Sequence, residues 1–262
     1  MKWIKTRNIS FFLLILSGIF LCLAITYCDI LTKVEKHSFS TKEEYDTVTD
    51  GLAFLDKMPI QFNIVNKYFS GFSNVDNEDK EKIAIAYAIK NNYGLVNCDS
   101  SSANNICVSR YFLEESEYLD NIFDTNLSFS KKDIPIYIDG YGMRIAKYIR
   151  SKDYYQIYIE NDANDNVLYS SFYKYYKRDD LYVFYLFQGY RLKRCDIGTK
   201  LYLYDFMNGN TVFTGVCDSN NDFAIEPDTD SINLQLYKYE LKKDTNGQFY
   251  LYGYNPVNKY GI

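Results

Sequence analysis

Histidine is almost absent from this chain, and its scarcity excludes most nucleophilic catalysis. His37 is the only histidine among the 262 residues. It stands between a long apolar segment and the part of the chain whose pattern predicts folded structure. Ser-His and Cys-His mechanisms need an imidazole base beside the nucleophile, so both are nearly excluded for the folded part.

Metal and phosphate sites lack their usual residues as well. The sequence has no C-x-x-C pair and no glycine-rich loop that would cradle a phosphate. Two acidic loops, residues 162–166 and 218–222, place oxygen-bearing side chains at alternate positions. An EF-hand calcium loop also needs Gly at its sixth position and Glu at its twelfth, and both loops lack them. We therefore expect plain turns here, no metal site and no cofactor.

One long apolar run is present near the amino terminus. Residues 9–27 are uncharged, with Lys2, Lys5 and Arg7 before them and Asp29 after them. At about 1.5 Å per residue, a helix of this length nearly spans the roughly 30 Å hydrocarbon core of a bilayer. The preceding basic residues predict a cytoplasmic amino terminus. Residues 1–28 are thus expected to form a cytoplasmic tail and a single-pass transmembrane anchor, whose partner is the lipid bilayer.

Cleavage of this run is the alternative. A signal peptide usually has an apolar core of about 7–15 residues, followed by small residues before the cut. Here the run is longer, and its best small-x-small site, residues 24–26, is poor. The pattern favours retention in the cell membrane, and secretion after cleavage stays open.

Charge and cysteine content agree with an exterior location. Without the three basic residues before the run, 26 basic and 34 acidic residues remain, a net charge of −8. Such a surface repels phosphate backbones, so we expect no nucleic-acid partner. The four exterior cysteines form two local pairs, Cys98 with Cys107 and Cys195 with Cys217. Local pairs in an exported chain predict disulfides, and four free thiols are the alternative.

The first half of the exterior region is patterned for helices. Residues 29–39 are expected to form a stalk and residues 40–131 a helical half-domain. Capping-box spacings at Ser40–Glu43 and Thr41–Glu44 predict a helix that ends before Pro59. Further helices are expected over residues 60–69, 78–92 and 110–123, the second capped by Asp76 or Asn77 and the third by Ser109.

From residue 134 the apolar period changes from 3.6 to 2, which predicts strands. The connections are short, and Asn208-Gly209 and Asn246-Gly247 are strong hairpin turns, so the strands should be antiparallel. The predicted fold class is α+β, with an amino-terminal transmembrane helix and then helices packed on one curved antiparallel meander sheet. Its β half, residues 132–262, contains eight candidate strands: 135–139, 154–160, 167–177, 181–192, 199–206, 211–217, 232–241 and 248–254.

Tyrosine is abundant in these strands and alternates with aliphatic residues. Leu201 and Leu203 alternate with Tyr202 and Tyr204, and the last strand repeats the pattern around Leu251. This alternation predicts one aliphatic face and one tyrosine-rich face. Tyrosine suits half-wet binding surfaces, but it is also a good strand former. The candidate ligand-binding residues are Tyr202, Tyr204, Tyr250, Tyr252 and Tyr254.

Two segments carry a resemblance to known proteins. The closing segment LYKYELKKDTNGQFYLYGYNPV and the upstream segment ICVSRYFLEESEYLDNIF are similar to uncharacterised membrane-anchored extracytoplasmic proteins of low-GC Gram-positive bacteria. Those proteins share an amino-terminal anchor, a helical segment and a final aromatic hairpin. The resemblance implies topology and no particular activity.

The sequence therefore predicts a membrane-anchored extracytoplasmic module that binds an unknown protein or envelope component. Carboxylates occur mostly in turns and at helix starts, where capping and solvation explain them, so we expect no catalytic residues. A carboxylate-dependent hydrolase of envelope polymers and a structural component of a membrane complex are the two alternatives.

Overall fold

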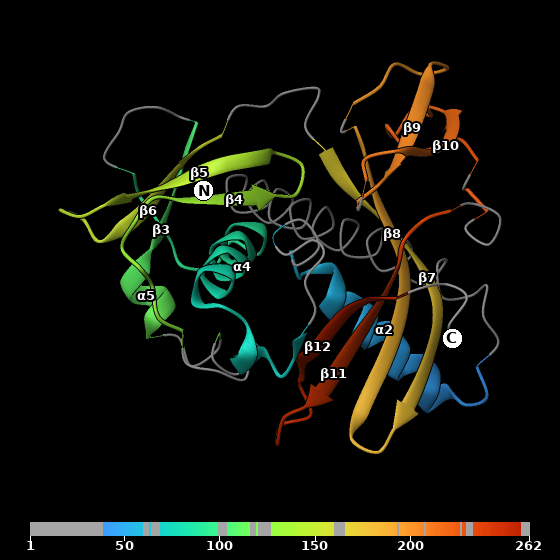
Figure 1. Ribbon diagram of the computed structural model, residues 1–262, viewed down its shortest axis with the longest axis horizontal. Helices are drawn as coiled ribbons and strands as arrows, with labels where there is room; N and C mark the ends of the chain where they lie inside the picture. Colours follow the sequence, from blue (N-terminus) through green and yellow to red (C-terminus); the bar gives the residue numbers. More distant parts are fainter. Residues whose placement is uncertain are drawn as a thin grey trace, which may run out of the picture. The chain divides into compact units, whose positions relative to one another are not determined.

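The computed structural model describes residues 39–59, 63, 69–98, 104–115, 119, 127–159, 166–192, 194–206, 208–225, 227–228 and 233–257 (Figure 1). The chain divides into two compact units, Met1–Ala53 and Phe54–Ile262. The predicted anchor over residues 9–27 lies outside the described part. Within the part that is described, no helix is long and apolar enough to cross a bilayer.

Helix α2 (Lys42–Asp56) begins and ends where the sequence predicts. Of the two capping-box spacings, the structure uses the one at Thr41, whose Oγ1 accepts a hydrogen bond from the backbone N–H of Glu44 at 3.1 Å. The Glu44 carboxylate in turn accepts from the backbone N–H of Ser40 at 2.9 Å. Two otherwise unsatisfied donors at the helix start are thereby bonded. The helix ends three residues before Pro59, which cannot continue it.

Two further helices follow their predicted starts. Helix α4 (Asn77–Lys90) begins after Asp76, and its residues from Ile83 to Ile89 are all buried. Helix α5 (Arg110–Glu114) begins after Ser109, whose hydroxyl accepts from the backbone N–H of Phe112 at 3.1 Å. A short 3-10 turn, η1, covers Phe72–Asn74. The helix predicted over residues 60–69 lies outside the described residues except Asn63 and Phe69.

The strands form two antiparallel sheets instead of the single meander that the sequence predicts (Figure 1). The five-stranded sheet has the order β2-β3-β6-β5-β4. Its strands are β2 (Leu95–Val96), β3 (Asn105–Ser109), β4 (Ile134–Ile138), β5 (Gly142–Ile149) and β6 (Tyr154–Tyr158). The fold is thus α+β and dominated by sheet, and the expectation of one sheet is wrong.

The seven-stranded sheet has the order β1-β12-β11-β8-β9-β10, and β7 pairs with β8. Its strands are β1 (Phe69–Ser70), β7 (Asn166–Arg178), β8 (Leu181–Leu192), β9 (Lys200–Asp205), β10 (Thr211–Val216), β11 (Leu236–Lys243) and β12 (Phe249–Val257). All eight predicted strands are present. The sequence-based prediction missed β1, β2, β3 and β5.

The sheet branches at β8. Its first half pairs with β11, and its Gly189 and Tyr190 pair with β9. A Cβ atom at Gly189 would clash with the backbone oxygen of Tyr204, so this close approach of two strands requires glycine. One side of the branch carries a buried core of residues from β7, β8, β9, β11 and the segments next to β10 and β11: Tyr169, Val183, Tyr185, Phe187, Leu201, Leu203, Cys217, Phe223, Leu234 and Leu236.

Both predicted disulfides are present. Cys98 bonds Cys107 across a separation of 9 residues, and Cys195 bonds Cys217 across 22. Cys107 lies on β3, and Cys217 is 1 % exposed at the edge of the core. Each bridge restricts the unfolded chain and is expected to add roughly 2.5–3.5 kcal/mol of stability. Disulfides of this kind indicate an oxidising, extracytoplasmic environment.

Candidate functional site

The candidate ligand-binding tyrosines do not share one face of the sheet. Directly paired residues of neighbouring strands point to the same face. Tyr204 pairs with Tyr190, and Tyr254 pairs with Tyr239, which in turn pairs with Phe184. Tyr190 and Phe184 are an even number of residues apart on β8, so they point to the same side. The candidates therefore divide between two faces: Tyr202, Tyr204 and Tyr254 lie on face 1, and Tyr250 and Tyr252 lie on face 2.

A β-bulge in β12 explains why the alternation fails at Tyr254. The register with β11 shifts between Leu241, which pairs with Leu251, and Glu240, which pairs with Gly253. One extra residue in β12 reverses which side its later residues face. Tyr254 consequently turns inward and is 1 % exposed. The predicted division into an aliphatic and a tyrosine-rich face is thus wrong, because Leu251 and Leu203 also lie on opposite faces.

Face 1 carries a continuous row of aromatic rings. It begins at Tyr202, which is 36 % exposed, and passes inward to the buried Tyr254. Tyr190 and Tyr204 are stacked, with ring centres 5.1 Å apart and planes at 17°. Aromatic pairs at such separations stabilise beyond their buried area. The ring-centre distances along the row are 6.3 Å for Tyr202–Tyr204, 5.7 Å for Tyr190–Phe206, 6.2 Å for Phe206–Tyr237 and 5.5 Å for Tyr237–Tyr254.

The inner end of the row contains unusual tyrosines. Among the described residues, the hydroxyls of Tyr237 and Tyr254 make no hydrogen bond of normal geometry, although each phenol influences the pKa of the other. Burial raises the pKa of both phenols above their usual value. Tyr239 differs, because its hydroxyl donates to Gln188 Oε1 at 2.6 Å. The buried end of the row therefore contributes to core packing, and only its outer end is accessible to a ligand.

Face 2 holds Tyr250 and Tyr252 beside lysines. Lys242 Nζ lies 4.3 Å from the centre of the Tyr252 ring and forms an ion pair with Asp180 at 2.9 Å. This geometry is a cation–π contact at a partly exposed site. The structure thus accounts for Tyr252 by its contact with Lys242, and the ligand-binding role of all five candidates stays a prediction.

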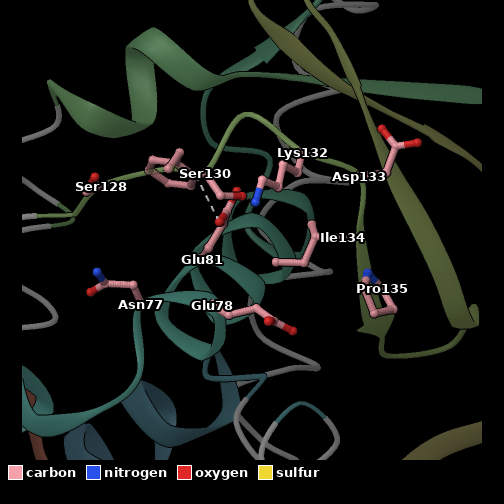
Figure 2. Close-up of a pocket in the computed structure, with 10 residues that line it drawn as sticks. Asn77, Glu78, Glu81, Ser128, Ser130, Lys132, Asp133, Ile134 and Pro135 are labelled. Atoms are coloured by element: carbon pink, nitrogen blue, oxygen red, sulfur yellow. Dashed lines mark hydrogen bonds between the residues drawn. The ribbon is translucent and has the colours of Figure 1, made fainter.

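A polar pocket of about 300 Å³ lies at the amino-terminal end of α4 (Figure 2). One wall is α4, and the other is the segment that leads into β4. Figure 2 shows Glu81 pointing from α4 toward the segment that carries Ser130. The lining residues are Asn77, Glu78, Glu81, Ser128, Phe129, Ser130, Lys132, Asp133, Ile134 and Pro135.

The pocket's three carboxylates each have a partner in the protein. Glu81 is 2 % exposed and accepts from the Tyr155 hydroxyl at 2.5 Å and from the backbone N–H of Ser130 at 3.1 Å. Glu78 pairs with Lys82 at 2.6 Å on the surface of the helix. Asp133 accepts from the backbone N–H of Tyr148 at 2.9 Å. A general acid or base must instead be aimed at a substrate.

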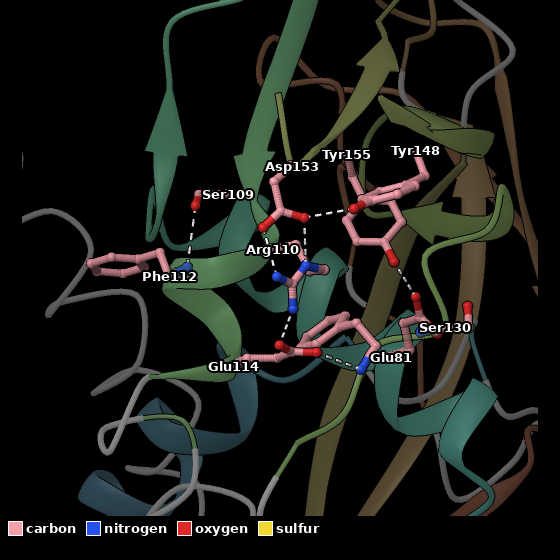
Figure 3. A network of polar contacts seen from close by, with 10 residues as sticks. Glu81, Ser109, Arg110, Phe112, Glu114, Ser130, Tyr148, Asp153 and Tyr155 are labelled. Atoms are coloured by element: carbon pink, nitrogen blue, oxygen red, sulfur yellow. Dashed lines mark hydrogen bonds and ion pairs between the residues drawn. The ribbon is translucent and has the colours of Figure 1, made fainter. Parts of the chain in front are cut away.

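Arg110 is the centre of a second polar group (Figure 3). Its guanidinium makes two hydrogen bonds of 2.6 Å to the two oxygens of Asp153 and also contacts Glu114. The Tyr148 hydroxyl donates to Asp153 at 2.6 Å. Hydrogen bonding by Arg110, opposed by partial burial, lowers the pKa of Asp153 to about 2. This bidentate pair joins the start of α5 to the turn between β5 and β6.

The two groups together hold the irregular segment that forms one wall of the pocket. The backbone N–H of Phe129 donates to Glu114 at 3.1 Å, and the next N–H, that of Ser130, donates to Glu81. Arg110 and Tyr155 bind the remaining oxygens of these two carboxylates. Figure 3 shows the resulting network. Because these charges are used to fix the backbone, their arrangement is structural.

In the described parts of the chain, no group of three or more His, Cys, Asp or Glu is placed to hold a metal ion. In the second acidic loop, Asp218 Oδ1 accepts from the backbone N–H groups of Asn220 and Asp222 at 2.7 and 2.9 Å. These bonds lower the pKa of Asp218 and close the loop as a turn. The first acidic loop, residues 162–166, lies outside the described residues except Asn166.

The sequence did not reveal the pocket or the Arg110 network. Both depend on contacts between residues 74 or 43 positions apart, such as Tyr155 with Glu81 and Arg110 with Asp153. The local sequence gives no signal for Glu81, which stands between Lys80 and Lys82 in a charged stretch. Comparison with known proteins finds no matching protein family, no matching curated protein and no matching solved structure.

Proposed function

We propose that the chain is a non-enzymatic binding or interaction module on the outer side of a bacterial membrane, held there by residues 9–27. The non-enzymatic part of this proposal depends on the hydrogen bonds of Glu81. It is the one buried carboxylate of the pocket, and its oxygens already accept from Tyr155 and Ser130. A buried acid so engaged stabilises structure instead of transferring protons. The resemblance to membrane-anchored extracytoplasmic proteins agrees with this proposal.

The outer end of the aromatic row is the proposed contact surface. Tyr202 is partly exposed, and the stacked pair Tyr190–Tyr204 lies directly behind it. Rigid tyrosine rings give a large contact area at low conformational entropy cost, and a tyrosine hydroxyl can add a polar contact. This combination suits an extended peptide or an envelope polymer.

Proximity labelling from the full-length anchored protein tests this proposal. The wild type is compared with Tyr202→Ala/Tyr204→Ala and with Tyr111→Ala, a control whose side chain is 62 % exposed on α5. We expect an exterior partner that the control retains and the double variant loses. Identical labelling in all three proteins would show that the aromatic row is not the contact surface.

A carboxylate-dependent hydrolase of envelope polymers is the second candidate. The observation that favours it is the presence of Glu78, Glu81 and Asp133 around one pocket. The test is release of soluble fragments from cell-wall polymer by the wild type and by Glu78→Gln/Asp133→Asn. Hydrolysis that this variant abolishes would contradict the binding proposal.

A further inference from the structure

Among the described residues, helix α4 covers the inner face of the five-stranded sheet, and the outer face is partly exposed. Its inner face contacts α4, and the Tyr155 hydroxyl on β6 reaches Glu81 of that helix. Cross-strand pairs assign the other residues to an outer face: Pro135 pairs with Ile145, and Tyr137 pairs with Met143. Part of this outer face is exposed, although Tyr137 and Cys107, which also point to it, are only 7 % and 1 % exposed. Its exposed apolar side chains are Val96 at 41 %, Met143 at 59 %, Ile145 at 55 % and Tyr158 at 53 %, together with the exposed Pro135.

Pro135, Ile145 and Tyr158 are neighbours across the strands, and Met143 lies two residues from Ile145 on β5; Val96 lies apart from them, beside Cys107. Ala146 pairs with Ile157, so the same register sets Ile145 beside Tyr158. Pro135 lies on the other side of Ile145. A contiguous exposed apolar patch on a folded domain marks an interaction site. The edge of β4 is closed, because Pro135 lacks an N–H and the Asn63 side chain bonds both the N–H and the C=O of Tyr137. The exposed part of the outer face, not the β4 edge, is therefore available for contact.

The charge of this sheet differs from that of the whole chain. The chain has a net charge of −5, yet the five strands contain no acidic residue. Lys147 is exposed on the outer face, and the exposed Arg150 and Lys152 follow in the next turn. Three described acids that flank the strands have partners: Asp133 with Tyr148, Asp139 with Lys90 and Asp153 with Arg110. The outer face thus offers apolar side chains next to the positive charge of Lys147.

A second copy of the chain fits this face poorly. Self-association through the same face would place Lys147 of both copies at one interface, and the strands contain no acidic residue that could pair with them. A partner must instead be negatively charged and must also accept apolar side chains. The surface of a bilayer that contains anionic lipids has both properties.

We propose that the outer face of the five-stranded sheet docks on the anionic surface of the bilayer to which the chain is tethered. The inference rests on the proposed anchor. Residues 28–41, which join the anchor to α2, span at most about 50 Å when fully extended, so the exterior part stays close to the bilayer. Met143, Ile145 and Tyr158 then enter the headgroup region, and Lys147 contacts lipid phosphates.

Quenching by brominated lipids tests the docking. The full-length chain is placed in nanodiscs of acyl-brominated phosphatidylcholine, with or without phosphatidylglycerol. Trp3, the only tryptophan, is first replaced by Phe. Tyr158→Trp then reports on the outer face, and Tyr202→Trp, at a partly exposed tyrosine of the other sheet, is the matched control. We expect strong quenching of the Tyr158→Trp indole in anionic discs and little quenching of the control.

Two further variants test the cause of docking. Lys147→Glu should reduce the docking equilibrium about fivefold or more, since a basic residue near an anionic surface contributes about 1 kcal/mol. Ile145→Asp should also reduce it, because this exposed side chain enters the headgroup region. Both substitutions are at exposed positions and should leave the fold intact.

The outcomes separate this inference from the proposed function. If the chain stays in the disc but Tyr158→Trp is quenched no more than the control, the docking is wrong and the anchor stands. If the chain leaves the disc, the anchor fails and the docking fails with it. A blue-shifted indole without quenching would identify a protein contact on this face and would also overturn the lipid proposal.

Discussion

Replacing Tyr155 by Phe should destabilise the protein by removing one hydrogen bond to a buried charge. Tyr155 is 0 % exposed, and its hydroxyl donates to Glu81, which is 2 % exposed. Loss of a hydrogen bond to a charged group costs about 1.5–3 kcal/mol. For a domain of this size we expect the melting temperature to fall by roughly 4–10 °C.

Urea titration of the full-length protein in detergent, followed by near-ultraviolet circular dichroism, measures this loss. Tyr158→Phe is the matched control, because Tyr158 lies on the same strand and is 53 % exposed. The control should change the free energy of unfolding by less than about 0.5 kcal/mol. Combining Tyr155→Phe with Glu81→Gln should give a coupling energy of about 1 kcal/mol or more. Equal stability of the Tyr155 and Tyr158 variants would refute the structural role of Glu81.

Three further perturbations test other parts of the structure. Asp153→Asn should lower the free energy of unfolding by about 1–2 kcal/mol at neutral pH. The folded state lowers the pKa of Asp153 from 3.8 to about 2, so this loss should be complete above about pH 5 and should vanish as the pH falls toward 2. Acid titrations of the wild type and the variant measure it. Tyr239→Phe removes the hydrogen bond to Gln188 and should destabilise the protein by about 1 kcal/mol in urea titrations. Tyr237→Phe removes a buried hydroxyl without a described partner and should be neutral or stabilising. The reverse order of stability would contradict the assigned hydrogen bonds. Cys195→Ala/Cys217→Ala should lower stability by about 2–4 kcal/mol, and an unchanged urea midpoint would show that this bridge is dispensable.

The burial of tyrosine hydroxyls should also make the stability of the protein depend on pH in the alkaline range. Folding raises the pKa of Tyr155 and Tyr254 above the usual 10.0. Their stabilising contribution is therefore present below about pH 10 and is lost as the pH rises further. Ultraviolet titration should show these phenols ionising together with unfolding. Ionisation near pH 10 of every tyrosine in a still-folded protein would contradict their burial.

Local pattern predicted the strands and helix starts well. Thr41 and Ser109 cap their helices as capping chemistry requires. The β7–β8 hairpin places Lys177 opposite Tyr182, and its register slips by one residue only beyond the bulge between Phe172 and Lys174. Such features depend on a few adjacent residues, so a sequence reveals them.

Sheet membership and the candidate site could not be predicted in this way. Strand β3 pairs with β6, which is far away in the sequence, and no periodic pattern indicates such a pairing. The bulge near Gly253 turns the Tyr254 side chain to the opposite face of the sheet. Strand β5 was missed although its exposed Met143 and Ile145 now define the exposed part of the outer face. The pocket depends on which elements Glu81 and Tyr155 bring together. These features arise from tertiary packing, which overrides local pattern.

Protease shaving of intact bacterial cells that carry the full-length chain tests whether residues 9–27 tether an exterior region to the membrane. We expect external protease to remove the disulfide-bonded region while an amino-terminal fragment that includes residues 9–27 stays in the membrane fraction after alkaline washing. A chain that is protected in intact cells, or one released whole into the medium, would contradict a tethered extracytoplasmic module.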